Sequence, residues 1–334
     1  MSESNKRNFI VHGSILAIAG ILVRIIGMLY RIPVVNIIGS EGNGIYGAAF
    51  NIYNIMLVLS SYGLPMAVSK LVSARFTKKR YKSAAKVLRC SLMVAVCTGG
   101  IAALLVFFGA SFIENVIYGG GLPGLAVPLR ILAPTIFLVA ILGVIRGFFQ
   151  GQSTMIPTAV SQILEQIVNA IVSIAAGYGM MKAFASSPDV AAYGAAGSTL
   201  GTMGALTAVL FMGFLYAVYT PTFNRLKRKD RHTENQSTGQ ICKIIIYTMI
   251  PIILGQTFYQ ISALIDDVMF SNIMVGRDIT KSISMDLGNF SSSYSLLIGI
   301  PQGVASAMSA SMLPSVVASF TDRDYDSIYD KITK

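Results

Sequence analysis

The sequence predicts an all-α polytopic membrane protein with about eight transmembrane helices. Hydrophobic residues make up 54% of the 334 residues and charged residues 12%, whereas an ordinary globular domain carries about 25% charged residues. Long apolar stretches recur along the chain, and Lys and Arg gather in every second connection between them. A helix of about 20 apolar residues crosses a bilayer, and basic connections stay in the cytoplasm. The pattern therefore predicts both the fold class and the orientation.

The apolar stretches define the spans in order. The first four are Phe9–Tyr30, Tyr46–Val68, Ala84–Phe108 and Leu125–Phe149. The last four are Ile156–Met181, Ala191–Tyr219, Ile241–Met269 and Phe290–Ala318. The connection from Lys70 to Arg89 holds eight basic residues and no acid, and the connection from Arg225 to Lys243 holds six basic residues. We therefore expect a multi-pass protein of the cytoplasmic membrane with its N-terminus in the cytoplasm.

Several function classes are excluded by what the sequence does not contain. The net charge of +11 does not indicate nucleic-acid binding, because the excess lies beside apolar spans, where orientation and anionic lipid headgroups explain it. The three cysteines and two histidines show no metal-type or triad spacing. No Walker loop, nucleophile elbow or dinucleotide fingerprint occurs. We expect no enzyme activity, no cofactor and no metal site.

The second and eighth spans resemble each other weakly. Tyr53 and Tyr294 align, and each is followed by an aliphatic run and then by Gly63 or Gly303. This similarity predicts an internal repeat. Residues 1–230 would form a six-helix lobe, and residues 231–334 would supply the first two helices of a second lobe and the start of a cytoplasmic amphipathic helix. On this interpretation the chain is truncated at its C-terminus.

Two arginines occur in or beside the first span. Arg24 lies well inside it, and an intramembrane charge is a functional candidate because its burial is costly. Arg24 could form a structural ion pair, or it could face a central cavity and hold a phosphate, since a guanidinium stays charged and offers a rigid donor fork. Arg31 lies seven residues later and could either line the same cavity or anchor the outer interface.

The fifth span carries a polar stripe. Ser161, Glu165, Asn169 and Ser173 recur every four residues, with Gln162 and Gln166 beside them. Such a stripe does not face lipid, so it either packs against another helix or lines a water-filled cavity. Glu165 is a candidate partner for Arg24 or Arg146, or a proton or cation site.

Further polar residues occur in the second and seventh spans. Asn51 and Asn54 add polar lining in the second span, and Gln256 and Gln260 do so in the seventh. Asp266 and Asp267 could bind a coupling cation, but a solvated helix terminus is the favoured interpretation. The glycines of the GSEGNG segment, residues 39–44, predict a tight turn.

Three segments resemble a known family. These are RIIGMLYRIPVVNIIGSEGNGIYGAAFNIYNIMLVLSSYGLPMAVSKLVS (residues 24–73), RGFFQGQSTMIPTAVSQILEQIVNAI (residues 146–171) and LPSVVASF (residues 313–320). They resemble the stage V sporulation protein B-like branch of the MOP flippase superfamily, which is related to lipid II flippases and polysaccharide exporters. The resemblance implies two six-helix lobes around a cavity that alternates between inward-open and outward-open states.

The arginines of that family carry over in part. Arg24 matches the arginine that opens the R-x-x-G motif of the first helix. The second arginine of the lipid II flippase pattern falls at Tyr30, with Arg31 one place on, and Leu57 and Leu296 stand where those flippases carry arginines. The resemblance therefore implies the fold more strongly than the substrate.

Our sequence-based hypothesis is a flippase for a polyprenyl-pyrophosphate-linked saccharide. The expected substrate-binding residues are Arg24, Arg31, Asn51, Asn54, Arg146, Ser161, Gln162, Glu165, Gln166, Asn169, Gln256 and Gln260. The expected ion-coupling residues are Glu165, Asp266 and Asp267. The expected partners are the lipid-linked saccharide, anionic membrane lipids and cell-wall synthesis proteins. A cation-coupled multidrug exporter of the MATE type and a non-transporting scaffold for envelope or spore assembly are the alternatives.

Overall fold

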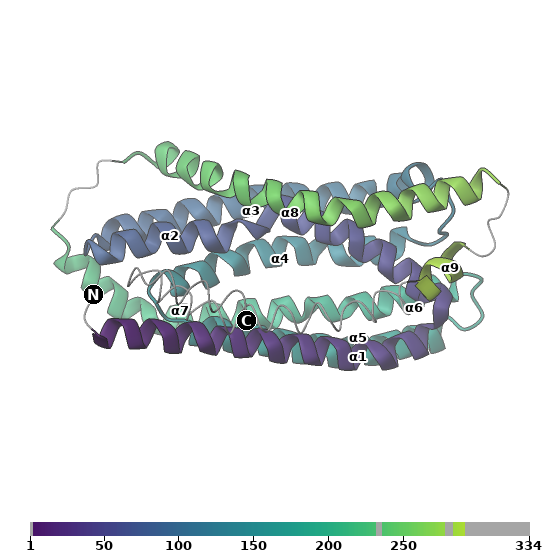
Figure 1. The fold of residues 1–334 in the computed structure, drawn as a ribbon, viewed down its shortest axis with the longest axis horizontal. Coiled ribbons are helices and arrows are strands. Elements are labelled where there is room, and N and C mark those ends of the chain that lie inside the picture. Colours follow the sequence, from purple (N-terminus) through teal and green to yellow (C-terminus); the bar gives the residue numbers. More distant parts are fainter. Residues whose placement is uncertain (1–2, 232–235, 278–282, 291–334) are drawn as a thin grey trace, which may run out of the picture.

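The computed structural model describes residues 3–231, 236–277 and 283–290, and every regular element in these ranges is helical. The helices lie along one long axis (Figure 1). They are α1 (Glu3–Leu57), α2 (Leu64–Thr77), α3 (Tyr81–Phe112), α4 (Ala126–Gly151), α5 (Ile156–Ala183), α6 (Val190–Thr199), α7 (Gly204–Lys229), α8 (Thr238–Val275) and α9 (Ile283–Phe290). Two π-helical turns, Val58–Tyr62 and Ile113–Ile117, and a 3₁₀ turn, Leu200–Met203, complete the described elements.

Helix α1 contains two passes joined at Gly39. The backbone of Gly39 leaves the helical region with φ 69° and ψ 179°, a conformation that glycine adopts without steric cost. The chain runs to one end of the bundle, turns back there and continues toward α2 (Figure 1). The predicted turn over residues 39–44 is therefore confined to Gly39, and the first pass extends well beyond its predicted end at Tyr30.

The predicted spans agree with the helices of the described residues. Six helical segments there are long and apolar enough to cross a membrane. The first of them, Ile18–Thr77, contains most of the first predicted span and all of the second. The sixth predicted span corresponds to α6, the 3₁₀ turn and α7. The eighth lies outside the described residues except for Phe290, and the assignment of residues 231–334 to a second lobe stays a prediction. The all-α polytopic class is confirmed.

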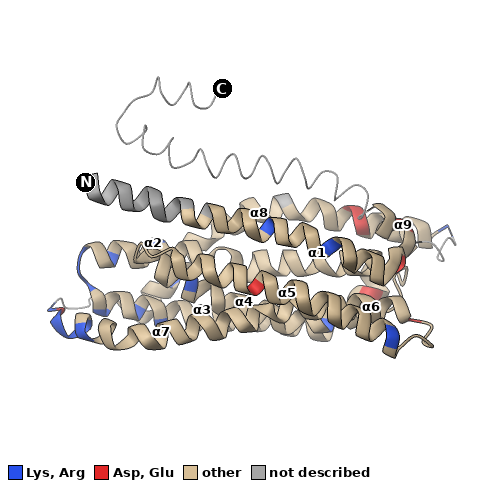
Figure 2. Ribbon diagram, turned by 90° about the horizontal axis from the view of Figure 1, so that it is seen from below, with Lys and Arg blue, Asp and Glu red and all other residues tan. Residues whose placement is uncertain are grey.

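The two most basic connections lie at the same end of the bundle, which we call the basic end. Arg75 Nη2 donates a hydrogen bond of 2.8 Å to Gln236 Oε1, and the backbone N–H of Lys82 donates one of 2.8 Å to Asp230 Oδ2. Lys and Arg gather there (Figure 2). This arrangement requires an even number of passes between the two connections, as the charge alternation predicts. We call the other end, which carries Gly39, the opposite end.

Two apolar clusters hold the passes together. At the basic end the ring of Phe223 stacks on Phe76 at 6.0 Å and meets the edge of Phe148 at 5.4 Å. Toward the opposite end, Tyr46 and Tyr118 are buried among aliphatic residues of α1, α4 and α9. Burial on this scale stabilises the fold through apolar contact and close packing.

Candidate functional site

An ion pair joins α4 to α5 inside the described part of the bundle. Arg146 Nη2 lies 2.8 Å from Glu165 Oε2, and Arg146 Nε donates a hydrogen bond of 2.8 Å to Ser161 Oγ. The Arg146 and Glu165 side chains are 14% and 27% exposed. Ser161 in turn donates to the Thr158 carbonyl at 2.8 Å. Glu165 is therefore the partner of Arg146 and not of Arg24, and it neutralises the Arg146 charge.

The outer part of the α5 stripe packs against α6. Ser173 Oγ lies 2.8 Å from the Ser198 carbonyl oxygen and 3.0 Å from Asn169 Oδ1. A Cβ on Gly201 would collide with the side chains of both Ser173 and Asn169. The glycine thus permits a close approach of the two helices. At these positions the stripe contacts the segment that holds α6 and the following 3₁₀ turn.

The inner part of the stripe reaches α1. A Cβ placed on Gly27 would lie 3.2 Å from Gln166 Nε2, so the first pass contacts α5 at this level. Both helices begin at the basic end (Figure 1), and residues three or four apart on a helix are neighbours. Arg24 therefore lies about one turn closer to the basic end than Gly27, near the level of Gln162.

Arg24 differs from the other arginines of the predicted site. Its side chain is exposed on the first pass, and within the described part of the chain it forms no hydrogen bond or ion pair. Arg146, by contrast, donates from Nε to Ser161 Oγ and from Nη2 to Glu165 Oε2. Arg24 is thus the cation whose hydrogen-bonding capacity is open to a ligand.

Arg31 belongs to the opposite end. Its Nη2 donates a hydrogen bond of 3.4 Å to Asn43 Oδ1, and its guanidinium carbon lies 5.0 Å from the centre of the Tyr46 ring. Asn43 Nδ2 donates to the Gly288 carbonyl at 2.9 Å. Through Asn43, Arg31 therefore helps to join α1 to α9.

Asp267 links α8 to the second pass of α1. Asn51 Nδ2 donates a hydrogen bond of 2.6 Å to Asp267 Oδ2. Helix α8 continues to Val275, so the predicted solvated helix terminus at Asp266 and Asp267 is wrong, although Asp266 itself is exposed. The hydrophobic stretch ends at Met269, but the helix does not end with it.

The remaining predicted residues are not brought into one cluster. Asn54, Gln256 and Gln260 are half-buried, and in the described part of the chain they make no side-chain hydrogen bond. Tyr53 is buried and lies close enough to Glu165 to interact with it electrostatically. The sequence does not relate Tyr53 to Glu165, because helix spacing does not report contacts between helices.

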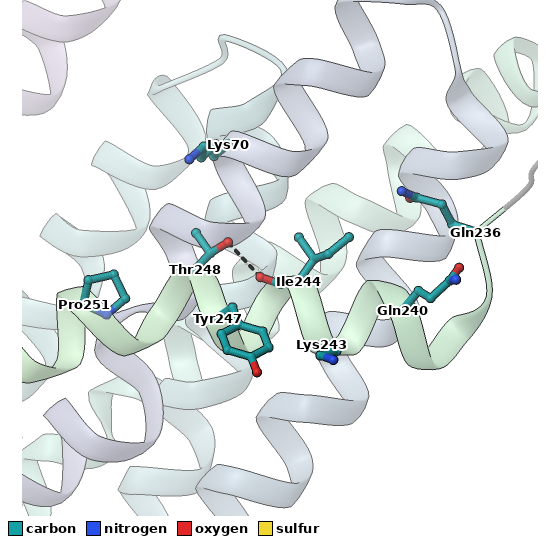
Figure 3. A pocket seen from close by; sticks show the side chains of 8 residues that line it. All are labelled: Lys70, Gln236, Gln240, Lys243, Ile244, Tyr247, Thr248 and Pro251. Carbon is teal, nitrogen blue, oxygen red and sulfur yellow. Dashed lines mark hydrogen bonds between the residues drawn. The ribbon is translucent and has the colours of Figure 1, made fainter.

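A hollow of about 790 Å³ lies between α2 and α8 at the basic end (Figure 3). It is lined by Lys70, Gln236, Gln240, Lys243, Ile244, Tyr247, Thr248 and Pro251. Lys243 Nζ lies 5.7 Å from the centre of the Tyr247 ring, and Thr248 donates to the Ile244 carbonyl at 2.7 Å. Sequence reasoning missed this hollow, although its two lysines mark the ends of the two basic connections.

Comparisons with known proteins agree with this architecture. Residues 10–320 match the family described as polysaccharide biosynthesis protein. The chain is 27% identical over 333 residues to the lipid II flippase MurJ of Bacillus subtilis (strain 168) and 25% identical over 315 residues to stage V sporulation protein B of the same organism. These alignments cover 96% and 93% of this chain but 60% and 58% of those proteins, so the chain spans about 60% of the length of these relatives.

A solved structure shows the same fold. A MATE protein in the straight conformation superimposes with a TM-score of 0.64 at 17% identity. The superposition covers 98% of this chain and 68% of that chain. The helical order described above is therefore that of the MATE and MOP transporters.

Proposed function

We propose, because this chain belongs to the polysaccharide biosynthesis protein family, that it flips a polyprenyl-pyrophosphate-linked saccharide outward across the cytoplasmic membrane. The cargo would be a peptidoglycan precursor such as lipid II, or a related polysaccharide unit. A charged, sugar-bearing headgroup cannot cross hydrocarbon unaided, because removing it from water without new partners is very costly. A transporter of this fold would supply those partners while the lipid tail stays in the bilayer, and would re-expose the headgroup by alternating access.

Arg24 is the observation that carries the proposal. It is an exposed guanidinium in an apolar first pass, and it has no partner among the described residues. Such a charge is costly in a membrane-spanning helix and is retained where it meets a ligand or water. Its planar donor fork matches the oxygens of a pyrophosphate. The neighbouring polar level of α5, which holds Gln162 and Gln166, would extend the same path toward the sugar.

The hollow between α2 and α8 supports an entrance from the basic end, which we predict to face the cytoplasm. Lys70 and Lys243 would attract the pyrophosphate. Gln240 offers an amide for hydroxyl groups, and the exposed ring of Tyr247 offers an apolar face. These are the groups that a charged saccharide headgroup needs before it moves to Arg24.

The test is substitution of Arg24 in the intact protein, expressed in a bacterium depleted of its own flippase. We expect Arg24→Ala to abolish export of the lipid-linked precursor without lowering the amount of protein in membranes. Arg24→Lys should retain part of the activity, because it keeps the charge but loses the donor fork. Precursor exposed at the outer surface and protein in the membrane fraction are the two readouts.

A matched control removes an arginine from another apolar pass. Arg130 of α4 is exposed and donates a hydrogen bond of 2.8 Å to Ser111 Oγ, remote from the basic end. Arg130→Ala should leave export near the wild-type level. Full export by Arg24→Ala would refute the role of Arg24 as the headgroup cation.

A cation-coupled drug exporter is the second candidate, and Asp267 is the observation that favours it. A half-buried carboxylate bonded to Asn51 between two passes is a suitable group for proton or cation coupling. This candidate predicts that the intact protein confers resistance to organic cations and that Asp267→Asn abolishes the resistance. A susceptibility panel that shows no change on expression argues for the flippase.

A further inference from the structure

Two adjoining hollows at the basic end contain a concentration of cations that the proposed transport does not use. The first, about 540 Å³, lies between α3, α7 and the start of α8, and its cations are Lys82, Lys86, Arg89 and Lys227. The second, about 580 Å³, shares Lys82 and Lys227 with the first and adds Arg228. None of these residues belongs to α1 or α5.

The described lining of the two hollows is basic. Among the described residues, no Asp or Glu lines either hollow. Asp230 is only 4% exposed, and its carboxylate accepts the backbone N–H of Lys82. Cations gathered without a counter-charge repel each other and favour a bound anion. The positive potential of these cations therefore favours the binding of a phosphate in the hollows.

Some of these cations are held in place by the fold. The Lys86 ammonium donates to the Gln236 backbone carbonyl at the start of α8. Lys227 Nζ lies 5.3 Å from the centre of the buried Phe223 ring. The side chains of Lys82 and Arg89 are exposed and can close on a ligand. Fixed cations beside mobile ones would lower the cost of ordering the site when an anion binds.

The wall of the first hollow is apolar on the side away from the basic end. Met93 lines it and is 56% exposed, and Val96, about one turn further along α3, is 47% exposed. Apolar side chains exposed on a membrane-spanning helix face lipid tails. A ligand with its phosphate among the cations would therefore carry its apolar part along Met93. Tyr216 lies near Arg89 and fits the interfacial level at which tyrosines gather.

We propose that the two hollows bind the phosphate headgroup of an anionic phospholipid, with its acyl chains against the α3 surface at Met93. A soluble phosphate would use only the cations, whereas a phospholipid uses both the cations and the apolar wall. Basic pockets between membrane helices on the cytoplasmic side are suited to such headgroups. The lipid is a bound ligand and not the cargo, so this inference goes beyond the proposed function and does not depend on it.

The experiment compares two triple variants of the purified protein that lose the same charge. Lys82→Gln/Arg89→Gln/Lys227→Gln removes three cations of the hollows and leaves the Lys86 contact intact. Lys78→Gln/Lys79→Gln/Arg80→Gln removes three exposed cations of the adjacent turn, which line neither hollow. Binding of phosphatidylglycerol and phosphatidylcholine is measured by native mass spectrometry and by the midpoint of thermal unfolding.

We expect the wild type and the turn variant to retain phosphatidylglycerol in preference to phosphatidylcholine and to be stabilised by it. The hollow variant should bind phosphatidylglycerol at least tenfold more weakly while unfolding at an unchanged midpoint without lipid. Equal binding by the two variants would overturn the proposal. So would equal binding of the two lipids by the wild type, or displacement of the lipid by millimolar glycerol phosphate, which would identify a site for a soluble anion.

Discussion

Two arginines in apolar passes, Arg146 and Arg24, differ in whether their side chains contact partners within the described part of the bundle. Arg146 forms an ion pair with Glu165 and a hydrogen bond with Ser161, so its charge is neutralised within the bundle. Arg24 has no hydrogen-bond or ion-pair partner among the residues that the structure describes. A paired, partly buried arginine has structural value, whereas an unpaired one in an apolar helix is expected to serve a ligand. Arg146, although predicted to bind substrate, is therefore better described as part of the scaffold.

The pairing of Glu165 yields a prediction about stability. Glu165→Gln leaves the half-buried Arg146 guanidinium without its counter-ion, and we expect a loss of about 1–3 kcal/mol. The exchange variant Arg146→Glu/Glu165→Arg restores an ion pair and should recover much of that loss. The midpoint of thermal unfolding of the purified protein measures both effects. Equal destabilisation by the single and the exchange variant would contradict a stabilising pair.

This pairing also changes how activity data should be interpreted. Loss of export in Glu165→Gln would not by itself establish a coupling carboxylate, because the same substitution disturbs Arg146. Export by the exchange variant would assign Glu165 to structure. No export by a stable exchange variant would assign it to transport.

At the residue scale, the sequence predicts which polar side chains share a face of a helix better than it predicts the residues that they contact. Helical spacing placed Ser161, Glu165 and Gln166 on related faces of one helix, and all three contact other passes. It could not decide between Arg24 and Arg146 as the partner of Glu165, because the choice depends on which helices pack together. Hydropathy places Asp267 near a helix end for a related reason. It marks where the apolar residues stop, whereas the helix continues as long as its backbone hydrogen bonds do.

At the scale of elements, glycines set the closest contact at the opposite end. A Cβ on Gly44 would collide with the Ser284 carbonyl oxygen of α9, and a Cβ on Gly288 would collide with the Ser40 carbonyl oxygen of α1. The two backbones therefore touch without intervening side chains. Small residues allow such approaches between membrane helices, where close packing replaces the hydrophobic effect as the source of attraction.

This contact predicts a large effect of a small substitution. Gly44→Ala should separate α9 from α1 and cost about 1–3 kcal/mol, because the obstructing atoms belong to the backbone and cannot rotate away. Gly20→Ala in the same helix is the matched control, since a Cβ there meets nothing within 4 Å. The midpoint of thermal unfolding should fall only for Gly44→Ala. A similar midpoint for both variants would show that the contact is dispensable.

The boundaries of the elements were the least predictable part of the fold. The first pass reaches Gly39, and α8 reaches Val275, in each case beyond the end of the hydrophobic stretch. A hydropathy window detects what a bilayer would cover, whereas a helix ends where the backbone changes conformation. At Gly39 that change depends on one positive φ angle, which a cluster of glycines suggests but does not locate.

At the scale of the whole molecule, the basic connections that alternate along the sequence lie together at one end of the bundle. The turns that carry Lys and Arg meet at one end (Figure 2), and hydrogen bonds join them. The orientation of that end in the membrane is a prediction of the positive-inside rule. The hollow lined by Lys70 and Lys243 and the two hollows that share Lys82 and Lys227 lie at this end. The rule therefore predicts that all three lie at the level of the cytoplasmic leaflet.

Labelling of introduced cysteines tests the orientation. In a background in which Cys90, Cys97 and Cys242 are replaced by serine, Lys78→Cys marks the basic end. Ser186→Cys marks the exposed turn between α5 and α6. A membrane-impermeant maleimide added to intact cells should label the Ser186→Cys variant and should label the Lys78→Cys variant only after permeabilisation. The reverse pattern would place the basic end outside and would contradict the proposed direction of transport.

The single-residue connection at Gly39 has a consequence for biosynthesis. Gly39 joins the first two passes without an intervening loop, so we expect them to enter the membrane together as one helical hairpin. Arg24 then enters the membrane beside a partner segment and not alone in hydrocarbon. A bulky residue at position 39 is strained at this positive φ, so we expect it to hinder formation of the hairpin and to lower the amount of protein in the membrane.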